Sequence, residues 1–216
     1  MRILKKKEIE DYNVQYIAPM VLKGVHENVG YHACWSEDLE KILAEGIKPN
    51  GHVNQEVLVT SMYLDQHKTK NISDDFYRTI SVYMYHEMRL EFLRDDLKEG
   101  NAMIAVDLTD LDWHIASIEL SGFCLCSIEE FDKWIKNDDL KKYCKLYWKN
   151  CFSKEEYVQR KGEKADKRWG LDEILYMGVM PPERLKVVDK DNIRDLVKDE
   201  WKDKYEEIFE KVKLKL

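Results

Sequence analysis

The stretch GYHACWSEDLEKILAEGIKPNG, Gly30 to Gly51, decides the fold prediction for this chain. The apolar and aromatic run over 29–35 indicates a strand, and Ser36 is a suitable N-cap for the helix behind it. Gly46 stands where a left-handed residue ends helices, and Pro49 prevents continuation. The sequence therefore predicts a strand, a short helix and a glycine stop, the helix burying one apolar stripe: Leu39, Ile42 and Leu43.

Outside this stretch, the spacing of apolar residues predicts further strands and helices, in no regular alternation. Strands are expected over 56–64, 102–108, 115–126, 171–179 and 185–188, and helices over 72–97 and 128–148. A charged C-terminal helix is expected over about 191–214. This order predicts a mixed α+β fold rather than a doubly wound sheet. We expect one domain spanning 1–216, with a helical insertion at about 128–150.

Composition narrows the class of protein. The chain has 216 residues with 9 Gly and 4 Pro, which favours one helix-rich domain without a flexible linker. The formal charge of −7 argues against a general nucleic-acid binder. The 5 cysteines have no framework spacing, which is typical of a reducing compartment. No window approaches the ~18 apolar residues of a membrane span, so a cytoplasmic protein with no membrane partner is expected.

Metal and cysteine chemistry have weak signals. No Cys-x-x-Cys pair occurs, and His86-Glu87 lacks a second histidine at metalloprotease spacing, so no metal site is expected. Cys34 follows His32 by two residues on the same strand face, but a nucleophilic pair needs an activating geometry. A buried thiol is the simpler interpretation of Cys34.

Three residues on different segments form a better candidate site. They are His32 on the first strand, Tyr63 on the expected second strand and Glu173 on a late one. Glu173 begins the apolar run Ile174 to Met177. A carboxylate in that position is more often a surface charge at a strand edge, so the surrounding motifs carry the interpretation.

The segment YHACWSEDLEKILAEGIKP resembles the opening motif of the ADP-ribosyltransferase-like families, and DEILYMGVMPPERLKVV is similar to their closing motif. VLVTSMYLD occupies the place of the middle motif. The three motifs are most similar to those of the His–Tyr–Glu branch, which includes DarT-type toxins and the catalytic domains of poly(ADP-ribose) polymerases. The matching stretches cover about a fifth of the chain, in the right order. The resemblance implies the split, mixed β-sheet of that family with flanking helices, and an NAD⁺-dependent glycosyltransferase.

The resemblance also implies roles for particular residues. The reaction cleaves the bond between nicotinamide and ribose, so positive charge develops on the ribose, as in glycoside hydrolysis. Glu173 would stabilise this charge, and His32 would hydrogen-bond the adenosine ribose. The backbone of Ala33 would meet the nicotinamide amide, and Tyr63 would stack on the nicotinamide ring. Two hydroxyls are alternatives to Tyr63 if the middle motif aligns differently: Thr60 and Ser61.

The acceptor of ADP-ribose stays open between nucleic acid and protein. Ala33 stands where many relatives carry Gly or Thr, and Leu171 stands where arginine-modifying relatives carry Glu or Gln. The loop before the catalytic strand usually helps choose the acceptor, and its cations and indole suit a phosphate backbone and a base. A solvated charged loop is the simpler alternative. These loop residues are Arg160, Lys161, Lys164, Lys167, Arg168 and Trp169.

The sequence alone therefore leaves several functional hypotheses open. The leading one is a mono-ADP-ribosyltransferase, with a toxin or a defence or counter-defence effector as its cellular form. An NAD⁺-dependent RNA 2′-phosphotransferase is a second enzyme on the same fold, and an inactive binding module is the non-enzyme alternative. The C-terminal helix is expected to pack on the sheet, with docking of an antitoxin or inhibitor as its alternative use.

Overall fold

The computed structural model describes residues 18–49, 55–124, 138–160, 172–214 and 216. In this part of the chain seven strands form one sheet in the order β5-β4-β6-β2-β1-β3-β7, and every pairing is antiparallel. The α+β prediction is confirmed, whereas the prediction of a mixed sheet is wrong. The strands are β1 Val29–Trp35, β2 Ser81–Tyr85, β3 Asn101–Asp107, β4 His114–Ser117, β5 Phe152–Ser153, β6 Asp172–Met177 and β7 Leu185–Val187.

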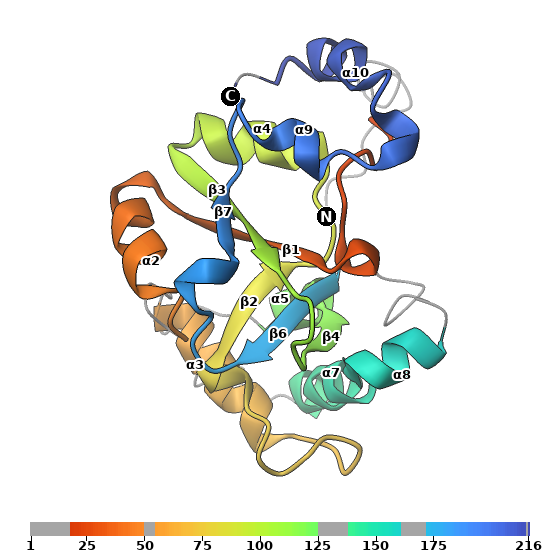
Figure 1. Cartoon of the computed structure of the whole chain (residues 1–216). Coiled ribbons are helices and arrows are strands. Elements are labelled where there is room, and N and C mark those ends of the chain that lie inside the picture. Colours follow the sequence, from red (N-terminus) through yellow and green to blue (C-terminus); the bar gives the residue numbers. More distant parts are fainter. Residues whose placement is uncertain (1–17, 50–54, 125–137, 161–171, 215) are drawn as a thin grey trace, which may run out of the picture.

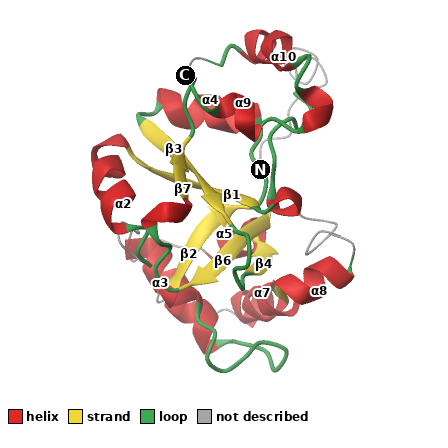
Figure 2. Cartoon of the chain, viewed as in Figure 1, coloured by secondary structure: helices red, strands yellow, loops and turns green. Residues whose placement is uncertain are grey.

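Helices cover the sheet and its ends (Figures 1 and 2). The longer ones are α2 Leu39–Glu45, α3 Gln55–Gln66, α4 Leu90–Lys98, α5 Ile118–Cys124, α7 Asp138–Lys149 and α8 Lys154–Gln159. The C-terminal part contains α9 Ile193–Leu196 and α10 Tyr205–Val212. Short 3-10 turns are η1 Val25–Glu27, η2 Ser36–Asp38, η3 Arg78–Ile80, η4 Pro182–Arg184 and η5 Asp199–Trp201.

Both faces of β6 are buried. Ile174 and Leu175 are adjacent and fully buried, and they belong to different hydrophobic clusters, because neighbouring side chains of a strand point to opposite faces. The cluster around Ile174 includes Trp113 and Ile42, and that around Leu175 includes Trp148. Burying a side chain of this size contributes about 1.5–3 kcal/mol. The sheet is therefore the central layer of the fold.

The opening and closing sequence motifs contact each other. Gly46 has a φ of 85°, and a Cβ built there would lie 2.2 Å from the Met180 carbonyl oxygen, so only glycine fits. The next residue, Ile47, exchanges two backbone hydrogen bonds with Met180, of 2.9 and 2.8 Å. The predicted strand over 29–35 and the glycine stop are confirmed. The two hydrogen bonds therefore connect the segment after α2 to the segment that follows β6.

The strand predicted over 56–64 is wrong, because this segment is the helix α3. Its β-branched and aromatic residues favoured a strand, yet its inward-facing positions recur at helical spacing. They are Val57, Thr60, Ser61 and Leu64, of which the last three are buried.

Two other segments also differ from their predictions. The expected helix over 72–97 contains the strand β2 followed by α4, because SVYMY pairs along its whole length with β6. The strand expected over 115–126 ends at Ser117, where α5 begins. Around a run as short as SVYMY, apolar residues four positions apart fit both a helical pattern and the alternation of a strand, so the pattern does not distinguish the two.

The single helix predicted over 191–214 is three short helices, α9, η5 and α10. Val197 breaks it: the residue is fully buried and extended, and it bridges Leu22. Lys23 donates its backbone N–H to the Leu196 carbonyl at 2.7 Å, and Lys198 to the Val21 carbonyl at 2.8 Å. The predicted apolar stripe still packs, because Ile193, Ile208 and the neighbouring residues belong to one cluster with α4.

His114 gives the fold a predictable pH dependence. Its imidazole packs on the Phe76 ring with 3.9 Å between centroids, and burial lowers its pKa against the opposing effects of Glu156 and Asp112. The unfolded chain therefore binds this proton more readily, and the folded protein should lose stability as the pH falls through about 6.5. Urea unfolding at pH 7.5 and 5.5 measures the loss, which His114→Phe should reduce. An equal loss in both proteins would contradict the assignment.

Candidate functional site

A pocket opens where two central strands of the sheet separate. β1 and β2 share one paired position, Tyr31 with Tyr85, although each is paired along its length on its other side. Past that position, His32 Nδ1 lies 2.8 Å from the Tyr83 carbonyl oxygen, so an imidazole links the diverging strands. The pocket between them has a volume of about 640 Å³. This volume lies in the usual range for a small-molecule site.

The pocket brings together three residues that the sequence assigned to one site. His32 and Ala33 of β1 and Glu173 of β6 all line it. The pairings through Tyr31 and Tyr85 place Glu173 and His32 on opposite faces of the sheet. They reach one pocket because the strands separate between them.

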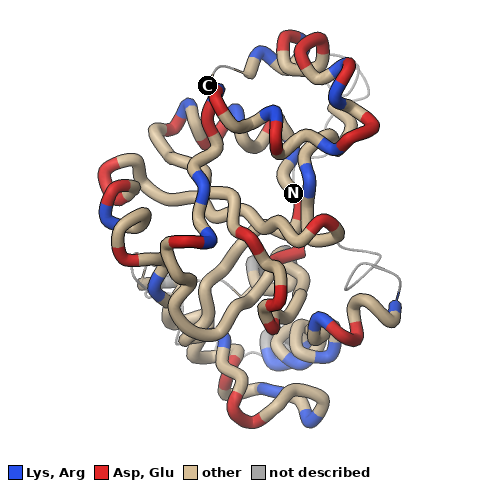
Figure 3. Tube along the Cα trace, in the orientation of Figure 1, with Lys and Arg blue, Asp and Glu red and all other residues tan. Residues whose placement is uncertain are grey.

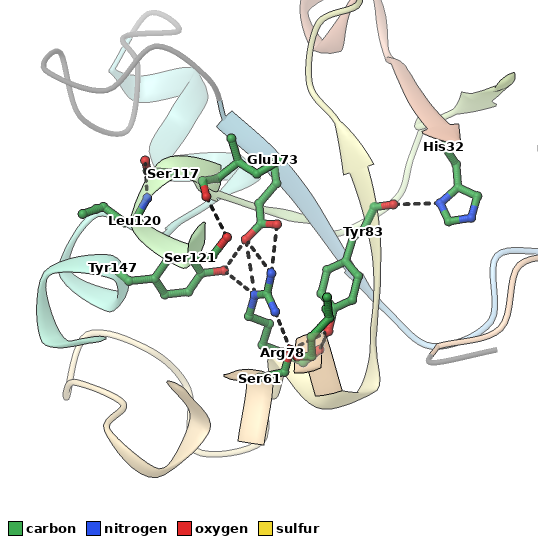
Figure 4. Close-up of polar contacts among 11 residues, drawn as sticks. His32, Ser61, Arg78, Tyr83, Ser117, Leu120, Ser121, Tyr147 and Glu173 are labelled. Atoms are coloured by element: carbon green, nitrogen blue, oxygen red, sulfur yellow. Dashed lines mark hydrogen bonds and ion pairs between the residues drawn. The ribbon is translucent and has the colours of Figure 1, made fainter. Parts of the chain in front are cut away.

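Glu173 is buried, with 3% of its surface exposed, and its carboxylate is held by an arginine and a tyrosine (Figure 4). Arg78 donates to Oε1 from Nε at 3.3 Å and from Nη2 at 3.2 Å, and to Oε2 from Nη2 at 3.1 Å. The Tyr147 hydroxyl donates to Oε1 at 2.7 Å. Within the described residues, Oε1 thus accepts three hydrogen bonds and Oε2 accepts one. Oε2 keeps the greater capacity to accept from a ligand.

Arg78 is itself fixed on several sides. Its guanidinium lies 4.4 Å from the centroid of the Tyr83 ring, and Nη1 donates to the Ser61 hydroxyl. Its backbone N–H donates to Asp65 at 2.9 Å, and its carbonyl accepts from the Tyr83 hydroxyl at 2.6 Å. The carboxylate therefore rests on a rigid partner that costs little to order when a ligand binds.

Arg78 and Glu173 form an ion pair in a buried position, and each charge stabilises the other. Burial alone would lower the pKa of Arg78, but the charge of Glu173 and its hydrogen bonds raise it above the ordinary arginine value. The pKa of Tyr147 is raised well above its ordinary value, first by burial and then by Glu173. Arg78 is therefore a permanent cation and Tyr147 a permanent hydrogen-bond donor at neutral pH.

The three predicted middle-motif residues do not line the pocket. Tyr63 is 4% exposed and packs on His67 with 4.5 Å between ring centroids, and Thr60 donates to the Cys124 carbonyl at 3.4 Å. Ser61 contributes indirectly through its contact with Arg78. The aromatic residue that lines the pocket on the second strand is Tyr83. The prediction of a strand at Tyr63 is wrong, and Tyr83 of the strand β2 lines the pocket.

Sequence reasoning also missed Arg78 and Tyr147. One signal was available for Tyr83, since SVYMY alternates as a strand does. Arg78 precedes this run by three residues, and Tyr147 lies in the predicted insertion, where α7 indeed forms. Neither carries a local motif, because their roles arise from contacts across 95 and 26 residues of chain.

The thiol of Cys34 also lines the pocket, yet it is a poor nucleophile. Burial, and after it the charge of Asp38, raise its pKa to about 11. The reactive thiolate is therefore scarce at neutral pH. Cys34 is half-buried, so the prediction of a buried thiol is wrong in that respect.

Of the predicted acceptor residues, Arg160 alone lies in the described part of the chain. Its guanidinium stacks on Phe152 at 3.7 Å from the ring centroid. The other five lie outside the described residues: Lys161, Lys164, Lys167, Arg168 and Trp169. Elsewhere, α2 and α10 both carry acidic and basic residues, with acidic ones in the majority (Figure 3).

Within the described residues, no three His, Cys, Asp or Glu side chains are grouped so as to hold a metal ion. No helix in this part of the chain is long and apolar enough to cross a membrane. Comparison with known proteins gives no further identification, since no family model, curated protein or solved structure matches the chain.

Proposed function

We propose that this protein is a mono-ADP-ribosyltransferase that uses NAD⁺ and has the split-sheet fold of that family. The observation that carries the proposal is the pocket between β1 and β2. There His32 and Glu173, from the two motifs that resemble this family, line the same cavity. The contact of Gly46 with Met180 adds a second link between those motifs.

The lining of the pocket suits a dinucleotide. Tyr83 and Trp35 line the pocket and are aromatic side chains of the kind that packs against planar rings, and the imidazole of His32 offers a polar edge between the strands. Lys41 supplies a cation for a phosphate group from α2. Lys48 contributes less, because it pairs with Glu45. We infer that NAD⁺ binds across the separation of the strands.

Glu173 carries the chemical role in this proposal. When nicotinamide leaves with its bonding electrons, positive charge develops on the ribose, and a fixed carboxylate beside it lowers the barrier. Oε1 accepts three hydrogen bonds from Arg78 and Tyr147 and Oε2 accepts one from Arg78, so we assign this task to Oε2, which keeps more capacity to accept.

We assign a macromolecular acceptor, nucleic acid or protein, to the transferred group. The basic loop over 160–169 supports nucleic acid through its composition, while the formal charge of −7 opposes it. Labelled NAD⁺ incubated with protein lysate, RNA, and single-stranded and duplex DNA identifies the acceptor class by the fraction that becomes labelled. An antitoxin or inhibitor partner remains part of the same proposal.

A 2′-phosphotransferase fits the pocket less well. That reaction needs several cations around a phosphate group, and the described cationic side chains lining the pocket are Lys41 and Lys48. Arg78 is committed to Glu173. A binding module without catalysis is distinguished from an enzyme by whether bound NAD⁺ is cleaved.

NAD⁺ binding by calorimetry tests the proposal. We expect the wild-type protein to bind NAD⁺ and His32→Ala to bind it about 10-fold more weakly, because one hydrogen bond to the ligand is lost. Cys34→Ala is the matched control, since Cys34 lies two residues along β1 and lines the same pocket. Its affinity should stay within about twofold. Failure of the wild type to bind, or equal affinities for His32→Ala and wild type, would overturn the assignment.

A further inference from the structure

Two cysteines lie against each other in the contact between α5 and α7. The sulfur atoms of Cys124 and Cys144 are 3.5 Å apart, and both residues are buried, at 1% and 0% exposed. Cys124 is the last residue of α5, and Cys144 lies inside α7. They are separated by 20 residues in the chain. The proposed NAD⁺ chemistry uses neither thiol.

We propose that Cys124 and Cys144 are a dithiol site that a hydroperoxide converts into a disulfide. A disulfide needs a sulfur–sulfur distance of about 2.05 Å, so the two atoms must approach by about 1.5 Å. Side-chain rotations at two helix positions that already touch supply such a movement. The pair is therefore preorganised for this bond, in contrast to Cys34 on β1.

The reaction balances with a hydroperoxide as the oxidant. One thiol, as its thiolate, attacks the terminal peroxide oxygen, forms a sulfenic acid and releases an alcohol or water. The second thiol attacks that sulfur, the sulfur–sulfur bond forms, and water leaves with the hydroxyl oxygen. Each cysteine sulfur is oxidised by one electron, and the peroxide is reduced by two. Because both sulfurs are buried, the rate is set by local opening of the contact.

The bond would fix the helix that reaches the candidate site. Cys144, Tyr147 and Trp148 lie on one side of α7, at spacings of three and four residues. Tyr147 donates to Glu173, and Trp148 Nε1 donates to the Leu64 carbonyl at 2.6 Å. Linking Cys144 to Cys124 would therefore hold α7 to α5 while α7 presents Tyr147 to the carboxylate.

Counting free thiols tests the proposal without any assay of NAD⁺. The folded full-length protein is treated with hydrogen peroxide, unfolded, alkylated with N-ethylmaleimide and weighed by mass spectrometry. We expect two fewer adducts than the 5 cysteines allow, full recovery after dithiothreitol, and a melting temperature raised by about 6–12 °C. Retention of all five adducts, or addition of oxygen to these sulfurs without a bond between them, would overturn the proposal.

Variants identify the partners. Cys124→Ala and Cys144→Ala should each abolish the paired loss of adducts, whereas Cys126→Ala should keep it. Circular dichroism of the untreated variants checks that they fold. Because Cys126→Ala keeps both buried thiols, a paired loss in this variant excludes Cys126 as a partner even if the other variants unfold, and mass spectrometry of the non-reduced peptides of the oxidised wild type then identifies the linked pair. Persistence of the paired loss in Cys124→Ala, or its absence in Cys126→Ala, would assign the bond to another pair.

Discussion

Glu173→Gln is expected to lower the rate of NAD⁺ cleavage by about 1,000-fold while changing NAD⁺ affinity much less. Glutamine keeps the shape of the side chain and an oxygen for Tyr147, but it removes the negative charge that would face the developing cation. Nicotinamide release under saturating NAD⁺ measures the rate. Calorimetry measures the affinity.

The change also leaves the buried Arg78 without its counter-charge, so a loss of folded protein must be separated from a loss of chemistry. Asp172→Asn is the matched control. Asp172 is the preceding residue of β6, equally buried at 3% exposed, and its side chain points to the other face of the sheet. Asp172→Asn should keep the cleavage rate per folded molecule. Cleavage by Glu173→Gln at a comparable rate would remove Glu173 from the catalytic role.

The parts of the fold that follow local rules could be predicted from the sequence. The strand over 29–35 and the stop at Gly46 are fixed by a short apolar run and by a backbone conformation that glycine adopts. The early part of α3 could not be assigned on composition, because its β-branched residues favour a strand while its buried positions follow a helix. Contacts with α5, α7 and η3 decide between them.

Some residues of the candidate site could likewise be predicted from the sequence, and others could not. His32 and Glu173 stand in recognisable motifs, and they line one pocket. Tyr83, which lines the pocket, was not predicted, because its strand was expected to be a helix. Arg78 has no local motif, since its ion pair with Glu173 forms only when β6 lies beside η3. Residues that support a reactive group through long-range contacts leave no local trace in a sequence.

Arg78→Met is expected to lower the free energy of unfolding by about 3–5 kcal/mol, because it leaves the Glu173 carboxylate buried without a cation. Methionine fills a similar volume, so the loss reports charge more than packing. Urea unfolding followed by circular dichroism measures it. Arg94→Met is the control: Arg94 pairs with the exposed Asp95 and donates from Nη1 to the Val212 carbonyl at 3.1 Å, so its loss removes one partly exposed ion pair and one hydrogen bond and should cost about 1–2 kcal/mol.

The double variant Arg78→Met/Glu173→Leu separates stability from function. A buried ion pair replaced by apolar side chains of similar size is often neutral for stability, so the double variant should be more stable than Arg78→Met alone. It should nevertheless cleave no NAD⁺, because the carboxylate is gone. Equal stability of the two variants would show that Arg78 and Glu173 are not coupled. The expected result, recovered stability without NAD⁺ cleavage, would mean that the fold does not need the ion pair. The charge of Glu173 would then be required only for the reaction in the pocket.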